Sequence, residues 1–319
     1  MDKLATNYFM RGLADSTQKS YRSGQNRYLR FCGNASYTAV PASESVLCHF
    51  VSYLAHQNLK HKTIKVYLSA IRFLHIMEGA EDPFQPSRLR LQYVLRGIKR
   101  AEAQRSGSGK ERLPISSNIL RKIKAVWEGS ASDPDTVMLW AACCLAFFGF
   151  LRAGEMTVPS DAAYDPSVHL NRSDIAVDNP SRPTVMRVTI KQSKTDPFRR
   201  GVNLFLGRTS SDLCPIVAML NYLLVRGPQE GPLFKYKDGR YLTRQRFVVA
   251  VREALERAGL EQAKYCGHSF RIGAATTAAA KGMEDSLIKT LGRWRSLAYL
   301  DYIRLPRDQL ANYSRVLCA

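Results

Sequence analysis

The chain has 319 residues and a formal net charge of +20, from 47 Lys and Arg against 27 Asp and Glu. This length suits two domains and allows cores that fold without disulfides or metals. The seven cysteines are scattered without a CxxC pair, and no signal-like apolar run opens the chain, so we expect a reducing, intracellular compartment. The longest apolar run, Met138 to Leu151, is too short for a membrane span and predicts a buried helix in a soluble protein without a membrane partner.

The positive charge is spread over the whole chain. Residues 1–110 carry 17 basic and 7 acidic side chains, and the remainder carries 30 and 20. Because both parts have the same surplus, a polyanion held by both is the natural partner, and nucleic acid is the commonest one. A basic protein without such a ligand would have the same composition, so charge alone does not decide.

Residues 1–105 predict a helical bundle that binds DNA. The apolar residues have a helical period in four stretches, 16–32, 43–57, 61–78 and 87–104, and Ser16 is the N-cap candidate of the first. Four amphipathic helices in about 100 residues are typical of a small bundle. Its polar faces have fewer acidic residues than ordinary solvated faces. The candidate DNA contacts on these faces are Lys60, Lys62, Lys65, Arg72, Arg96, Lys99 and Arg100.

Residues 106–113 predict a linker, because SGSGKER interrupts the apolar periodicity before LPIS restarts an ordered element. The second domain, 114–319, is expected to be mainly α with a small β-hairpin, which gives an α+β fold class. Residues 184–206 alternate apolar and polar side chains around a turn, as in a hairpin. The predicted helices of this domain are 117–129, a nearly apolar central helix at 135–156, 244–259, 268–282 with Gly282 as a C-cap, and 284–294.

Three residues of this domain are candidates for binding a phosphate. Arg152 has Glu155 three positions later, although an arginine there could also complement a helix C-terminus. His268 and Arg271 are three positions apart, so a helix presents both on one face, where two donors can hold one phosphate. HxxR is a weak pattern by itself, and a capping or surface histidine explains it equally well.

The hairpin and the C-terminal part contain further candidates. Lys194 lies near the hairpin turn and could reach into a groove, but it could also be a solvated turn residue. Lys191 is its competitor, since hairpin register cannot be fixed from sequence. Trp294, Tyr299 and Tyr302 could be core residues, and either tyrosine could be a nucleophile.

The order of these residues is more specific than any one of them. An arginine, a hairpin lysine, HxxR, a tryptophan and a C-terminal tyrosine follow one another as in the catalytic domain of the tyrosine recombinase family, which this chain resembles. GFLRAGEM is similar to the first arginine box of that family, SKT to its hairpin lysine, GHSFRIGAAT to its HxxR box, and LGRW with YLDYIR to its final box. The family also places a helical core-binding domain first. The forms of these boxes in this chain, SFRIGAAT and GRW, are most similar to those in recombinases of eukaryotic mobile elements of the DIRS, Ngaro and Crypton kinds.

The resemblance implies a site and a mechanism. Its catalytic set would be Arg152, Lys194, His268, Arg271, Trp294 and Tyr302, with Glu155 in support. Tyr302 would be the nucleophile that forms a 3′-phosphotyrosyl link, because Tyr299 lies too close to Trp294 for the spacing of the box. Lys194 would be the general acid, and neither a metal nor ATP would be needed as a cofactor.

The resemblance also implies partners. We expect double-stranded DNA, a homo-tetramer assembled on it, and a C-terminal tail helix that docks on a neighbouring subunit. The location would be the nucleus in a eukaryote and otherwise the cytoplasm. The alternatives are a type IB topoisomerase-like enzyme and a non-catalytic helix-turn-helix protein that uses residues 268–294.

Overall fold

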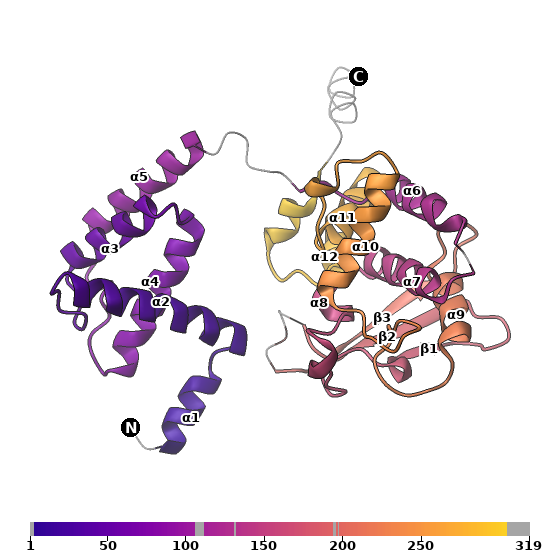
Figure 1. The fold of residues 1–319 in the computed structure, drawn as a ribbon, viewed down its shortest axis with the longest axis horizontal. Coiled ribbons are helices and arrows are strands. Elements are labelled where there is room, and N and C mark those ends of the chain that lie inside the picture. The colour runs from indigo at the N-terminus through magenta and orange to yellow at the C-terminus, as the bar shows by residue number, and fades with distance from the viewer. Residues whose placement is uncertain (1–2, 106–111, 131, 194–195, 197, 305–319) are drawn as a thin grey trace. The chain divides into compact units, whose positions relative to one another are not determined.

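The computed structural model describes residues 3–105, 112–130, 132–193, 196 and 198–304. The chain divides into two compact units, Met1–Gly109 and Lys110–Ala319 (Figure 1). Each unit has its own hydrophobic core. Most of the predicted linker, 106–111, lies outside the described residues. Leu113 already belongs to the second unit, because its N–H donates to the Lys264 carbonyl at 3.0 Å.

The first unit is a helical bundle. Tyr28 and Phe50 lie at the centre of its core, fully buried, with ring centroids 5.1 Å apart. The predicted N-cap at Ser16 is wrong: the helix begins at Asp15 with Ala14 as N-cap, where the Asp15 carboxylate suits the positive end of the helix dipole. The sequence analysis did not predict the helix that precedes this one, Lys3–Arg11. The helices are α1 (Lys3–Arg11), α2 (Asp15–Asn34), α3 (Glu44–His56), α4 (His61–Met77) and α5 (Leu89–Arg105).

The second unit is mainly helical around a small sheet, which confirms the α+β fold class. Its helices are α6 (Ser117–Glu128), α7 (Pro134–Phe148), α8 (Ala153–Met156), α9 (Pro215–Arg226), α10 (Arg244–Arg257), α11 (Ser269–Ala280) and α12 (Asp285–Leu291). Short 3-10 turns occur at η1 (Asp161–Ala163), η2 (Arg172–Asp174), η3 (Gln262–Lys264) and η4 (Leu297–Tyr302). No helix within the described ranges combines the length and apolarity that crossing a membrane requires.

The sheet contains the predicted hairpin. Strands β2 (Val185–Ile190) and β3 (Val202–Gly207) are antiparallel, with Ile190 opposite Val202. Met186, Val188 and Ile190 are buried, as their alternation indicated. A third strand, β1 (Ile175–Val177), pairs with the other edge of β2 and was not predicted, because three residues are too few to show a period.

The predicted central helix at 135–156 is wrong in its length, because the structure divides it into α7 and α8. Helix α7 is buried on nearly every side and packs against α9 and α11. It ends at a turn in which Phe150 has a left-handed backbone, φ 49°. The Leu151 N–H donates to the Ala146 carbonyl at 3.0 Å, which closes the turn. Arg152 therefore starts a new helix instead of extending the apolar one.

Candidate active site

The short helix α8 holds Arg152 against Glu155. Arg152 is the N-cap of this helix, and its backbone N–H donates to Glu155 Oε2 at 3.0 Å. The Arg152 guanidinium donates through Nη1 to Glu155 Oε1 at 2.8 Å. Glu155 is 5% exposed and Arg152 16%, so the pair is largely desolvated while part of the arginine reaches the surface. In this geometry Glu155 orients Arg152 through a charge-assisted bond.

A second arginine, Arg293, binds the same carboxylate. Its Nη2 donates to Glu155 Oε2 at 2.8 Å, and its Nη1 donates to the Gly149 carbonyl at 3.2 Å. Sequence reasoning missed this residue, although it lies inside the LGRW motif. An arginine directly after a helix-ending glycine has no periodic signal that distinguishes it from a solvated cation. Its side chain is only 12% exposed, and that fact comes from the structure alone.

Arg271 is fully buried on α11 and lies between the ends of two other helices. Its Nη1 donates to the Phe150 carbonyl at 2.6 Å after α7, and its Nη2 donates to the Gly292 carbonyl after α12. Carbonyls at helix C-termini favour a cation because the helix dipole is negative there. The Arg271 Nε has no hydrogen-bond partner within the described residues.

The site has an excess of buried positive charge. Arg152 and Arg293 both contact the carboxylate of Glu155, and Arg271 and Arg293 both donate to the Phe150 carbonyl. Burial lowers the pKa of Arg271 to about 9, and the charges of Arg152 and Arg293 act in the same direction. Burial also lowers the pKa of Arg293. In the part of the chain that the structure describes, no three His, Cys, Asp or Glu side chains lie close enough to hold a metal. The cluster is therefore suited to an anion.

Two aromatic rings cover Arg271. The Trp294 ring lies 4.1 Å from the Arg271 guanidinium carbon, and the Tyr302 ring lies 5.7 Å from it. The centroids of the Trp294 and Tyr302 rings are 5.1 Å apart. Trp294 is buried, whereas Tyr302, at the end of η4, is partly exposed. Gly292 makes the stacking possible, because an added Cβ there would lie 1.6 Å from the Trp294 ring.

Tyr299 has a different environment. Its hydroxyl donates to Asp285 Oδ2 at 2.8 Å, and its ring is buried 6.4 Å from the Trp294 ring. The bond to Asp285 raises the pKa of the Tyr299 hydroxyl. Tyr299 thus joins η4 to the first turn of α12.

His268 lies at the exposed N-terminal end of α11, three residues before the buried Arg271. The two side chains therefore differ strongly in exposure. Gly267 places His268 next to the Arg152 helix, because a Cβ on Gly267 would lie 2.9 Å from the Ala153 Cβ. The structure thus brings Arg152, Glu155, Arg271, Trp294 and Tyr302 together, with His268 at the edge.

Known proteins are similar to this chain in sequence and in fold. A family model described as phage integrase, N-terminal SAM-like domain, matches residues 1–76. The integrase/recombinase xerD homolog of Selenomonas ruminantium is 23% identical over 292 residues, which cover 89% of this chain and 79% of that protein. The XerH site-specific recombinase bound to palindromic difH substrate, a post-cleavage complex, superposes with a TM-score of 0.61 at 19% identity, over 87% of this chain and 71% of that one.

Two further solved structures are similar over almost the whole chain. The integrase of the Tn1549 transposon, in complex with transposon right end DNA, has a TM-score of 0.60 at 13% identity and covers 99% of this chain and 98% of its own. A lambda integrase dimer bound to a COC′ core site has a TM-score of 0.57 at 15% identity, with 94% of each chain covered. This chain has the tyrosine recombinase fold. The three comparisons together support the tyrosine recombinase, or phage integrase, family.

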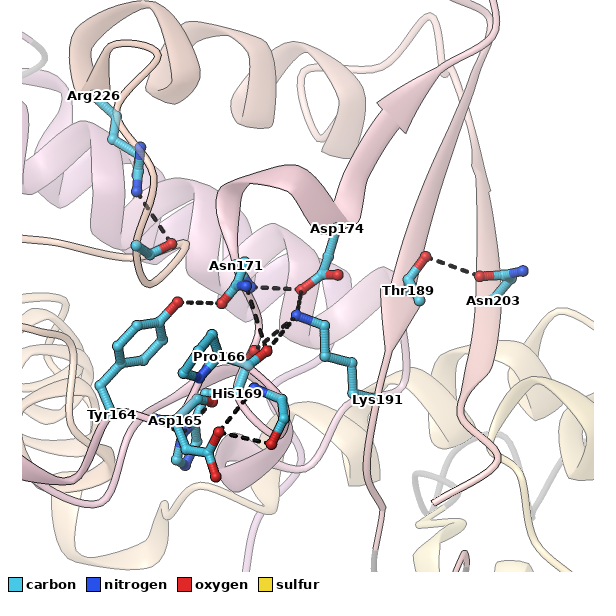
Figure 2. A network of polar contacts seen from close by, with 12 residues as sticks. Tyr164, Asp165, Pro166, His169, Asn171, Asp174, Thr189, Lys191, Asn203 and Arg226 are labelled. Carbon is cyan, nitrogen blue, oxygen red and sulfur yellow. Dashed lines mark hydrogen bonds and ion pairs between the residues drawn. The ribbon is translucent and has the colours of Figure 1, made fainter. Parts of the chain in front are cut away.

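The hairpin of this recombinase fold contains both lysine candidates. Lys194 lies outside the described residues. Lys191 follows β2, and its Nζ contacts Asp174 Oδ2 at 2.7 Å and donates to the Pro166 carbonyl at 2.8 Å (Figure 2). Asp174 Oδ2 also accepts from the Asn171 N–H at 2.7 Å. Through these contacts Lys191 holds the end of β2, where the hairpin turn begins, to the loop at residues 166–174.

The first unit of the chain presents its basic candidates to solvent. All seven predicted DNA contacts, Lys60, Lys62, Lys65, Arg72, Arg96, Lys99 and Arg100, are exposed. Two of them have a partner in the same unit: Arg72 Nε pairs with Asp82 Oδ1 at 3.0 Å, and the Arg96 guanidinium lies 5.3 Å from the Tyr93 ring. The tail from residue 305 onward, including the predicted tail helix, lies outside the described residues.

Proposed function

We propose that this protein is a site-specific DNA recombinase that cleaves and rejoins DNA through a 3′-phosphotyrosyl intermediate. Support comes from the fold it shares with recombinases whose structures contain a difH substrate, a lambda core site and a transposon end. The Tn1549 integrase and the SFRIGAAT and GRW motifs favour a mobile element as its source. Its substrate would be double-stranded DNA, bound by a tetramer.

The buried arginine cluster is the observation that carries the proposal. Three guanidinium groups and one carboxylate leave a positive excess in a largely desolvated place, which a phosphodiester would neutralise. Arg271 has an unpartnered Nε–H with which it can bind a non-bridging oxygen. Arg152, the more exposed of the three, would bind the phosphate from the surface side.

Tyr302 would be the nucleophile. Its hydroxyl oxygen gives its proton to water and forms a bond to phosphorus while the bond to the 5′ oxygen breaks, and Lys194 gives the leaving oxygen a proton. Rejoining reverses these steps, so the phosphotyrosyl bond stores the energy and no ATP or metal is consumed. Tyr302 is favoured as the nucleophile because the hydroxyl of Tyr299 is bound to Asp285. Lys194 is favoured as the general acid because the Nζ of Lys191 is paired with Asp174.

Access to Arg271 requires a movement. Arg271 is fully buried beneath Trp294 and Tyr302. Of the two rings, that of Tyr302 is the more exposed and the farther from Arg271, so we expect it to move aside when a phosphate binds. Tyr302 lies in a 3-10 segment of six residues and is partly exposed, and the movement would give up its ring contact with Trp294.

The test is a covalent adduct. The protein is incubated with a nicked duplex from which the short fragment that carries the new 5′-hydroxyl dissociates after cleavage, and an SDS-resistant protein–DNA band is sought. We expect the band with the unaltered protein in EDTA, and its absence in Tyr302→Phe, whose DNA affinity stays the same. No band under any condition would remove the proposal and favour a non-catalytic DNA-binding protein. Strand exchange between two duplexes then distinguishes a recombinase from a topoisomerase, which only relaxes supercoils.

A further inference from the structure

Arg293 occupies a backbone position that usually belongs to glycine. Helix α12 ends with the Trp294 N–H donating to the Lys289 carbonyl and the Arg293 N–H to the Thr290 carbonyl, both at 3.0 Å. In this type of turn the residue after the cap is left-handed, and glycine is favoured because it has no Cβ. Arg293 has φ 56°. An arginine here carries a backbone cost that its side chain must offset, which points to a role for the guanidinium.

The guanidinium of Arg293 connects the two arginines proposed to bind phosphate. Toward Arg152, it donates to Glu155 Oε2 at 2.8 Å, while Glu155 Oε1 holds Arg152 Nη1. Toward Arg271, it contacts the Phe150 carbonyl at 3.5 Å, and Arg271 Nη1 donates to that same oxygen. One planar group thus contacts a partner of each arginine.

We propose that Arg293 is a positioning residue that sets the guanidinium of Arg152 relative to that of Arg271. This inference rests on the proposed function, because it assumes that both arginines bind one phosphate. Arg293 does not contact the phosphate. It fixes the Glu155 carboxylate, which would otherwise rotate about its last torsion and leave Arg152 with a mobile partner. Small misplacements of a phosphate donor slow a reaction strongly, since the donor must match the transition state.

The chain offers two matched variants. Arg293→Gly removes the guanidinium and suits the left-handed backbone, so the turn after α12 should persist. Arg293→Lys retains the charge but has one point donor, which cannot contact both the carboxylate and the carbonyls. We expect both variants to melt as cooperatively as the unaltered protein and to bind nicked duplex with unchanged affinity. Their single-turnover rate of adduct formation should fall by about 10- to 100-fold, as when outer partners of a functional ligand are removed.

A double-mutant cycle separates positioning from a merely structural role. In an Arg152→Lys background, Arg293→Gly should cause little further loss, because the group that it positions is already altered. Normal cleavage by Arg293→Gly, or the same fractional loss in both backgrounds, would overturn the inference. Absence of the adduct in the unaltered protein would instead remove the proposed function itself, so the two failures are distinguishable.

Discussion

At the scale of single residues, the two tyrosines of η4 differ in what their hydroxyls contact. Tyr299 donates to Asp285, whereas Tyr302 lies partly exposed over Trp294 and Arg271. Tyr299→Phe should therefore retain the covalent adduct and lower the free energy of unfolding by about 1 kcal/mol, the usual net value of one hydrogen bond. Thermal melting and adduct formation measured on the same preparation check both parts. An adduct that vanishes in Tyr299→Phe and persists in Tyr302→Phe would show that Tyr299 is the nucleophile.

Glu155 allows a second prediction at this scale, because it is the one carboxylate that contacts both Arg152 and Arg293 within the described chain. Glu155→Gln removes the negative charge and leaves two largely buried cations close together. We expect it to lower the free energy of unfolding by about 3 to 5 kcal/mol, as when one partner of a buried ion pair is removed. Urea unfolding measures the change. A loss below about 1 kcal/mol would mean that water screens the cluster as at an exposed site.

The same excess charge predicts that a small anion stabilises the protein. Sulfate resembles a phosphate and should bind the arginine cluster, adding about 1.4 kcal/mol at ten times its Kd. In a unit of this size, about 2 to 4 °C in Tm corresponds to each kcal/mol. The shift should exceed that in chloride at equal ionic strength and should shrink in Arg152→Gln. Equal shifts in both salts would contradict an anion site.

At the scale of elements, the sequence predicts what periodic patterns encode. The alternation of apolar and polar residues predicted the β2–β3 hairpin, and the apolar run from Met138 to Leu151 predicted a buried helix. The break after α7 could not be predicted, because it depends on Phe150 in a left-handed conformation that the sequence does not favour for an aromatic residue. Arg271 reads as a polar helix residue in sequence, and its complete burial appears only when the ends of α7 and α12 meet around it.

The hairpin itself gives a prediction that separates its two lysines. If Lys194 is the general acid, its loss should be rescued by a substrate with sulfur in place of the leaving 5′ oxygen, because a thiolate leaves without protonation. Lys191→Met should instead lower the free energy of unfolding by about 1 kcal/mol, since Asp174 and the Pro166 carbonyl lose a partly buried partner. Any cleavage defect of Lys191→Met should remain with the sulfur substrate. Rescue of Lys191→Met, but not of Lys194→Ala, would reverse the assignment.

At the scale of the whole molecule, the charge of +20 predicts how DNA binding responds to salt. Each phosphate that a lysine or arginine neutralises releases counterions, so log affinity falls with log salt by about 0.9 per contact. Lys62 and Lys65 are exposed on α4, whereas Arg72 on the same helix is paired with Asp82. Lys62→Ala with Lys65→Ala should therefore make the salt slope shallower by up to about 1.8.

Arg72→Ala is the matched control for this last prediction, because it removes a cation of the same helix that already has a carboxylate partner. Its effect on the slope should be clearly smaller than that of one lysine, since the charge it removes is partly neutralised before DNA binds. Fluorescence anisotropy of a labelled duplex from low to moderate salt measures all three slopes. A nearly flat plot for the unaltered protein would mean that its positive charge serves something other than a DNA backbone. Equal changes for Arg72 and the lysines would mean that the Asp82 pair opens on DNA.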